Sequence, residues 1–165
     1  ASKISDRLSV LHKAKIHSST TDTVKTIKSL NLDSNEILIS HDVVSLYTNV
    51  PVDEAIEEAA NLLYSGTHSN DQPSFDKSTF VKLANLCLTN VLLSTTDGYY
   101  RQIEGLGMGS PASPLLANIW MSKFDDILKK ESPKLYKRYV DDILAIIPRE
   151  RIDGLFRKID KLHKI

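Results

Sequence analysis

The sequence predicts an α+β fold, because strand-like apolar runs alternate with amphipathic helical patterns along its 165 residues. The run Ile143-Leu144-Ala145-Ile146-Ile147 is bounded by a proline and is typical of a buried strand. Residues 36–44, EILISHDVV, have the β-branched apolar content of a buried central strand. Hydrophobic content of 41% and charged content of 25% are ordinary for a globular protein, so we expect one domain over residues 1–165.

Several segments place apolar residues at helical spacing, with charged residues between them. They lie at about 3–16, 22–30, 51–64, 77–90, 115–130 and 149–165. Candidate N-caps at residues 18–22 precede the second helix, and Pro51 and Pro114 stand where a first helical turn tolerates proline. These helices supply the α part of the predicted fold.

Charge and cysteine content exclude several classes of protein. The chain has 21 basic and 21 acidic residues, a balance that argues against a strongly basic nucleic-acid module. The single Cys87 lies in a helical pattern and is expected to be a buried structural thiol. Because the chain has one cysteine and no Cys/His set with zinc spacing, disulfides and structural zinc are excluded. The apolar runs are too short to span a bilayer and the first residues lack a signal-peptide segment, which predicts an intracellular protein without a membrane partner.

Two loops stand out before the last strands. VLLSTT-DG-YYRQIEG predicts a hairpin, with Asp97-Gly98 in a tight primed turn. Residues 105–109 are glycine-rich and lead into the helix that follows Pro114. Glycine lets the backbone approach a ligand closely, and the free amides of a helix start can receive phosphate. Such turns also occur without a ligand, so this pattern alone is a weak indication.

The most informative stretch is Tyr139-Val140-Asp141-Asp142, where two adjacent carboxylates precede the apolar run. We expect them at a strand–turn–strand junction, where crowded ionised groups lose solvation unless a cation or hydrogen-bond donors compensate. Divalent metal is one compensator. The alternative is a hairpin tip that uses Asp because Asp suits turns.

A third carboxylate, Asp42, stands at the exit of the strand predicted over residues 36–44. Asp42 and Asp141 are 99 residues apart, so only a sheet that brings their strands side by side could join them. Carboxylates from separate strands that hold two cations about 3.5–4 Å apart are what two-metal phosphoryl transfer requires. The strand-end Asp, the glycine loop and the Asp-Asp hairpin therefore supply the parts of such a centre.

Three blocks of the sequence resemble a reverse transcriptase, most closely of the Penelope-like retroelement branch. They are SHDVVSLYTNVPVDEAIEEA, YYRQIEGLGMGSPASPLLANIWM and KRYVDDILAIIP, in the order that the family has them. The resemblance implies a right-hand polymerase palm: a ferredoxin-like antiparallel sheet packed on helices, with part of the fingers. It also implies that upstream fingers blocks, primer grip and thumb are missing, so that this chain alone would be inactive.

The resemblance also assigns roles to residues. It implies that Asp42 and Asp141 are the catalytic pair that binds two Mg²⁺ ions, with Mn²⁺ as an alternative. It also implies that Asp142 is a catalytic and metal-binding residue beside the primer terminus, and that the Val43 carbonyl is a further metal ligand. Tyr47 matches the steric gate that blocks a ribose 2′-hydroxyl. If the strand stayed regular, Tyr47 would point opposite Asp42, so the chain must bend near residues 45–46. The loop residues expected to contact template and nucleotide are Gly107, Met108, Gly109, Ser110 and Ser113.

The implied reaction is RNA-directed DNA synthesis, with an RNA template, a DNA primer and deoxynucleoside triphosphates as partners, in the nucleus of a eukaryote. Gly107 stands where that family usually has proline, a departure that could loosen the loop. Two alternatives stay open. One is another palm nucleotidyltransferase such as an RNA polymerase, against which Tyr47 argues; the other is a truncated or domesticated remnant that binds nucleic acid or protein without catalysis.

Overall fold

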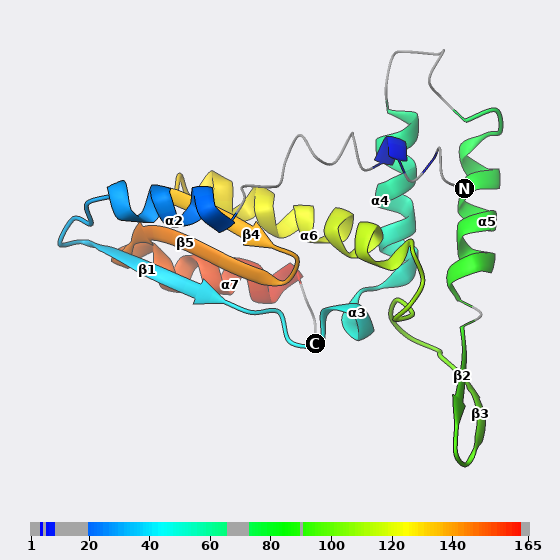
Figure 1. Cartoon of the computed structure of the whole chain (residues 1–165). Coiled ribbons are helices and arrows are strands. Elements are labelled where there is room, and N and C mark those ends of the chain that lie inside the picture. Colours follow the sequence, from blue (N-terminus) through cyan, green and yellow to red (C-terminus); the bar gives the residue numbers. More distant parts are fainter. Residues whose placement is uncertain (1–3, 5, 9–19, 66–72, 90, 163–165) are drawn as a thin grey trace. The chain divides into compact units, whose positions relative to one another are not determined.

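The computed structural model describes residues 4, 6–8, 20–65, 73–89 and 91–162 (Figure 1). The chain forms two compact units. Unit 1 consists of Ala1–Ala14 and Ser45–Trp120, and unit 2 of Lys15–Val44 and Met121–Ile165. Unit 1 contains the two-stranded sheet β2-β3, and unit 2 the three-stranded sheet β1-β5-β4.

The sheet of unit 2 is antiparallel throughout. β1 is Glu36–His41, β4 is Leu135–Tyr139, and β5, Asp142–Pro148, lies between them. β5 is the most buried strand, as its unbroken apolar run predicts. The prediction of a central strand over residues 36–44 is wrong in two respects: β1 is an outer strand of the described sheet, and it ends at His41.

Helices lie on both faces of this sheet (Figure 1). The register places His41 and Arg138 on one face and Ser40 and Lys137 on the other, because side chains alternate along a strand. The first face meets α7, Ile152–Leu162, through Phe156, and meets the second half of α6, Ser113–Lys130, through Asp125. The second face carries α2, Thr20–Ser29, and a short 3-10 helix, η2, Arg149–Arg151, joins β5 to α7.

Unit 1 is built on a pair of helices, α4, Val52–Tyr64, and α5, Lys77–Leu88. The Asp76 carboxylate caps α5 by accepting the Thr79 amide at 2.7 Å, and this bond lowers the pKa of Asp76. Tyr64 and Phe80 bring their rings to 6.4 Å between the two helices. The buried apolar face of α4 consists of Ala55, Ile56, Ala59, Ala60 and Leu63.

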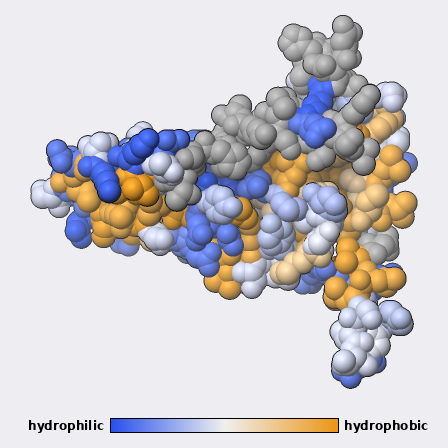
Figure 2. Space-filling model, viewed as in Figure 1, coloured by the Kyte–Doolittle hydropathy of each residue, from blue (hydrophilic) through white to orange (hydrophobic). Residues whose placement is uncertain are grey.

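The predicted hairpin of unit 1 forms, but its turn is displaced by one residue. β2, Leu92–Thr95, pairs with β3, Gly98–Arg101, so Thr96 and Asp97 make the turn. Neither has a positive φ, whereas Gly98 has φ 145°, so a primed turn at Asp97-Gly98 is ruled out. Figure 2 shows hydrophobic surface over α5 and the base of this hairpin, above a more polar tip.

The other predicted elements agree with the structure to within a few residues at their ends. The helix predicted over 3–16 lies largely outside the described residues. Cys87 is exposed, contrary to prediction. None of the helices within the described ranges has the length and apolar character needed to cross a bilayer.

Candidate active site

The two adjacent carboxylates lie at the tip of the β4–β5 hairpin, as predicted. Tyr139 pairs with Asp142, so Val140 and Asp141 form a two-residue turn. Val140 has φ 56° and Asp141 has no positive φ, the φ pattern of a type II′ turn, where glycine is the usual first residue. A β-branched residue in this conformation is strained by about 1–3 kcal/mol.

The register of β1 against β5 brings Asp42 to the same end of the sheet. His41 is the last residue of β1 and pairs with Ile143. One step further along each strand, Asp42 stands opposite Asp142, and Asp141 is the next residue in the turn. The sheet therefore joins two segments 99 residues apart at one end, as the predicted centre requires.

These carboxylates are more accessible to water than the sequence suggests. Asp42 and Asp142 are exposed, and Asp141 and Val43 are half-buried. The turn projects from the end of the sheet, so its acids keep part of their hydration. The loss of solvation expected from a neighbouring buried strand is correspondingly smaller.

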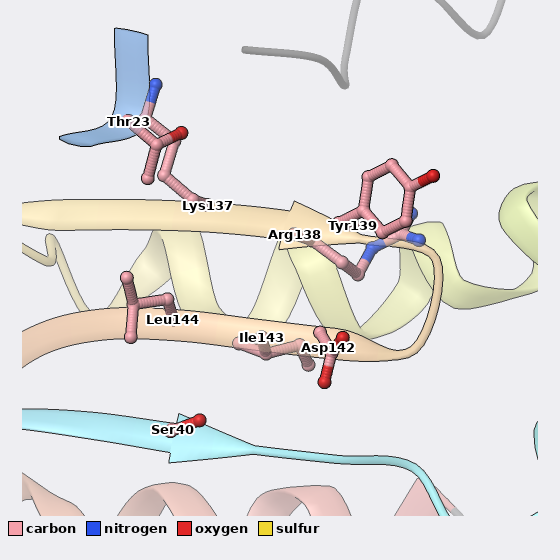
Figure 3. Close-up of a pocket in the computed structure, with 8 residues that line it drawn as sticks. All are labelled: Thr23, Ser40, Lys137, Arg138, Tyr139, Asp142, Ile143 and Leu144. Atoms are coloured by element: carbon pink, nitrogen blue, oxygen red, sulfur yellow. The ribbon is translucent and has the colours of Figure 1, made fainter. Parts of the chain in front are cut away.

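A cavity of about 270 Å³ opens beside the turn within unit 2 (Figure 3). Figure 3 shows Tyr139 and Asp142 at the turn end of this cavity and Lys137 near Thr23 farther along β4. Tyr139 is 70% exposed. The cavity thus combines an aromatic surface, a cation and a carboxylate, and sequence reasoning had singled out only the last.

Behind the turn, on the opposite face of the sheet, lies a buried polar cluster that sequence reasoning missed. Arg138 donates from Nε to Asp125 Oδ1 at 2.7 Å and from an Nη to Oδ2 at 2.9 Å, and both side chains are fully buried. The Tyr136 hydroxyl donates to the same carboxylate. Burial, reinforced by the negative charge of Asp125, raises the pKa of Tyr136 well above its usual value.

A sequence signal for this cluster exists. Asp125 is four residues after Met121 and three before Leu128, both fully buried, so helical periodicity places a carboxylate on the apolar face of α6. Buried carboxylates are normally paired. This rule predicts that Asp125 has a basic partner, but it does not identify Arg138 as that partner.

The candidates for nucleotide contact lie in unit 1. The chain bends where predicted: Ser45 has φ 51°, and α3, Leu46–Asn49, begins directly after it. Tyr47 is half-buried in α3, and its carbonyl accepts the Leu106 amide at 2.7 Å. The structure therefore joins the predicted steric gate to the glycine-rich loop.

Close packing explains two glycines of this loop. A Cβ on Gly105, which has φ 73°, would lie 2.5 Å from the Thr48 Cα and 2.6 Å from the Tyr47 carbonyl oxygen. A Cβ on Gly107 would lie 2.7 Å from a methyl group of Val91. These positions need glycine because neighbouring atoms fill the space that a side chain would take.

The loop is hydrogen-bonded at Gly107 and exposed to solvent at Met108 and Gly109. The Gly107 carbonyl accepts the Ser113 hydroxyl at 2.7 Å and the Ser110 amide at 3.3 Å. These two bonds tie the backbone at Gly107 to the residues that lead into α6. Met108 is 73% exposed, and Gly109 has φ 101° with open space around it. Ser113, which is buried, begins α6.

The acids of unit 2 fit a divalent cation by their chemistry. Carboxylate oxygens are the ligands that Mg²⁺ prefers, and such sites usually take one or two carboxylates and complete their shell with substrate phosphates. Across the ranges that the structure describes, no three His, Cys, Asp or Glu side chains form a group that could hold a metal ion. Asp42 and Asp141 would hold a cation as a pair.

Solved structures with a similar fold come from telomerase. The structure of telomerase from Candida albicans in complex with a fragment of telomeric RNA matches with a TM-score of 0.65 and 14% identity, over 94% of this chain and 30% of that one. Apo telomerase from Candida tropicalis, truncated of its C-terminal domain, matches with a TM-score of 0.66 and 17% identity, over 96% and 36%. The chain thus spans about a third of these proteins.

No curated protein matches the chain. The family model for reverse transcriptase (RNA-dependent DNA polymerase) matches residues 2–164. With the telomerase structures, this match confirms the predicted α+β fold as a reverse-transcriptase-like fold of helices and antiparallel sheets. The single domain over residues 1–165 and the roles of the site residues stay predictions. The chain belongs to the reverse transcriptase (RNA-dependent DNA polymerase) family.

Proposed function

We propose that this chain carries the polymerase centre of an RNA-directed DNA polymerase from a retroelement of the Penelope-like type. The observation that carries the proposal is the β1–β5 register, which brings Asp42 to the turn that contains Asp141 and precedes Asp142. Family membership supports a nucleic-acid polymerase. The retroelement origin rests on the three sequence blocks.

The conformation of the turn supports a chemical role for its acids. Asp suits turns partly because it tolerates a positive φ. In this turn the positive φ falls on Val140, and neither Asp141 nor Asp142 has one. The demands of the turn therefore do not explain two adjacent carboxylates, which weakens the alternative that they only shape a hairpin tip.

In the proposed reaction the primer 3′-oxygen attacks the α-phosphate of a deoxynucleoside triphosphate, and pyrophosphate leaves. Enzymes of this family generally use divalent metal ions, and two Mg²⁺, or Mn²⁺, would supply activation of the attacking oxygen and neutralisation of the phosphate charge. Asp42 and Asp141 would hold the cations, with the Val43 carbonyl as a further ligand. Asp142 and the exposed ring of Tyr139 would adjoin the primer end.

The unit 1 candidates would select the nucleotide. Tyr47 lies in α3, and its carbonyl accepts the Leu106 amide, so the backbone of the proposed steric gate is tied to the glycine-rich loop. Beyond that contact, Met108 and Gly109 are exposed and available to a base or a backbone phosphate. Both features support selection of deoxynucleotides at this loop.

The expected partners are an RNA template, a DNA primer and deoxynucleoside triphosphates, and the expected compartment is the nucleus. The Candida albicans telomerase structure with this fold contains a telomeric RNA fragment, which supports RNA as a partner of this chain. This chain matches 30% and 36% of the telomerase chains, so their activity is carried over only as part of the proposal.

Primer extension tests the proposal, using the chain alone and a chimera in which it replaces the matching region of an active reverse transcriptase. Asp42→Asn and Asp141→Asn in the chimera should each lower templated synthesis by about a hundredfold or more, because the cations lose a charged ligand. Asp53→Asn, at an exposed acid in the first turn of α4, is the control and should not change it. Full activity in both acid variants would reject the proposal.

The same chimera tests sugar selection. Tyr47→Val should admit ribonucleotides, because the smaller side chain frees the space that a 2′-hydroxyl needs. Unchanged discrimination would make Tyr47 a structural residue only. Tight primer–template binding without synthesis, unaffected by the acid variants, would favour the non-catalytic remnant.

A further inference from the structure

Besides its ion pair with Asp125, Arg138 makes a hydrogen bond to the turn that the packing of α6 on the sheet does not require. Two of the guanidinium nitrogens bind the two oxygens of Asp125, at 2.7 and 2.9 Å. Nη1 donates to the backbone carbonyl of Val140 at 2.7 Å. Figure 3 shows the Arg138 side chain running along β4 toward the turn. One side chain thus bridges α6 and the strained residue next to Asp141.

Strained backbone persists only where its surroundings hold it in place. Val140 is the residue of this turn with a positive φ, and its carbonyl is the group that Arg138 holds. The guanidinium is itself fixed, because Asp125 binds it through both oxygens and also accepts the Tyr136 hydroxyl. The planar fork of an arginine suits this bridge, whereas the single ammonium of a lysine does not.

We infer that Arg138, held by Asp125, is a positioning residue that keeps the Val140–Asp141 turn in its strained conformation and so places the Asp141 carboxylate. The inference rests on the proposed function only in treating Asp141 as a metal ligand. The conformation of the turn can be measured without any activity. If the role of Arg138 is purely structural, loss of the Asp125–Arg138 pair lowers the free energy of unfolding but does not change the conformation of the turn.

The chain offers a control next to the same strand. Lys134 immediately precedes β4 and donates to Asp33 Oδ2 at 3.1 Å and to Glu36 Oε2 at 2.7 Å. This ion pair also links parts of unit 2, but it lies at the end of the β4–β5 hairpin opposite the turn. Lys134→Met removes an ion pair of unit 2 without touching the turn.

The experiment is NMR on the 165-residue chain. In the wild type, a correlation across the hydrogen bond from Arg138 Nη1 to the Val140 carbonyl carbon should be present, and the amide–Hα coupling of Val140 should report a positive φ. Arg138→Lys should change that coupling and speed exchange of the Asp142 amide by about tenfold or more. Lys134→Met should change neither. A wild type without the correlation or without the positive φ overturns the inference.

Arg138→Lys leaves the buried Asp125 carboxylate poorly paired, which can destabilise the fold. A second variant therefore removes the whole polar cluster. The triple variant Asp125→Leu, Tyr136→Phe and Arg138→Met replaces the cluster with apolar side chains, a change that buried ion pairs often tolerate. It should fold with an altered Val140 coupling. A folded triple variant with the wild-type coupling contradicts the inference, as does an unchanged coupling in Arg138→Lys.

Two further readouts separate this inference from the proposed function. Mn²⁺ added to the wild-type chain should broaden the resonance of the Asp141 amide. If this amide does not broaden and Arg138→Lys still alters the turn, the assignment of Asp141 as a metal ligand is wrong, and the role of Arg138 in positioning the turn remains supported. In the active chimera, Arg138→Lys should lower kcat and leave KM for the nucleotide nearly unchanged. If Lys134→Met lowers kcat by the same factor, the effect of Arg138 is one of general stability and not of positioning the turn.

Discussion

The two hairpins of this chain have turns of equal length and very different surroundings. β4–β5 turns through Val140 and Asp141, and β2–β3 turns through Thr96 and Asp97. The first belongs to a three-stranded sheet with helices on both faces, and the second is a two-stranded sheet whose strands are almost entirely exposed. In the first the positive φ falls on a valine, and in the second on Gly98.

This difference shows where the molecule tolerates strain. A two-stranded hairpin is marginally stable by itself and can place a positive φ only where glycine makes it inexpensive. The β4–β5 hairpin can keep a valine there because a buried ion pair and a packed sheet hold it. The strained turn is also the one that contains Asp141 and directly precedes Asp142, and strained backbone is common at functional sites.

The largest effect should come from breaking the buried pair behind the first turn. Asp125→Asn leaves the Arg138 guanidinium buried without a matching charge, which should lower the free energy of unfolding by about 3–5 kcal/mol. Asp97→Asn, in the exposed turn of the other hairpin, should change it by less than about 0.5 kcal/mol. Urea denaturation measures both, followed at β5 amides for Asp125→Asn and at α5 amides for Asp97→Asn. Similar losses would remove the contrast between the hairpins.

Hydrogen exchange in the unmodified chain should show the next largest difference. Amides that pair β2 with β3 should exchange on the order of a hundredfold faster than those that pair β1 with β5, because exposed two-stranded pairing opens locally while the packed sheet opens with its unit. Mass spectrometry or NMR provides the rates. Equal protection would mean that the β2–β3 hairpin is covered in solution.

The smallest effect should come from exchanging the residue with a positive φ in each hairpin. Val140→Gly should raise the free energy of unfolding by about 1 kcal/mol, because relief of strain exceeds the entropy cost of glycine. Gly98→Val should lower the population of the β2–β3 hairpin, since valine disfavours φ 145°. Denaturation measures the first and Hα chemical shifts of Tyr99 and Tyr100 the second. A loss of stability in Val140→Gly would show that the turn is not strained.

Local patterns predicted most of the elements but not their long-range partners. The apolar run at 143–147 identified β5, and helical spacing identified α4 and α6 to within a few residues. The valines at 43–44 look like a continuation of β1, yet the strand ends at His41 and Ser45 then adopts a positive φ. Asp42, directly after His41, is the one local sign of that end, because aspartate is uncommon in strands.

For the candidate site, the sequence identified the acidic residues but not the residues that pack around them. Chemistry-bearing residues such as Asp42 and Asp141 were identified because carboxylates at strand ends are conspicuous, and the register brings them together. Arg138 escaped notice because basic residues on strands are usually solvated, and its partner Asp125 lies on another element. The close contact of Gly107 with Val91 was not predicted, because it is not a property of the loop sequence.

The central claim, that Asp42 and Asp141 form one cation site, is tested most directly by titrating the 165-residue chain with Mn²⁺ and following amide broadening. The amides at 42–43 and 141–142 should broaden first and together, and both Asp42→Asn and Asp141→Asn should abolish the effect at all of them, because the two carboxylates share the ion. Binding should be weak without nucleotide phosphates. Broadening that is equal at the exposed acids Asp53 and Asp97, or that survives both substitutions, would contradict the account.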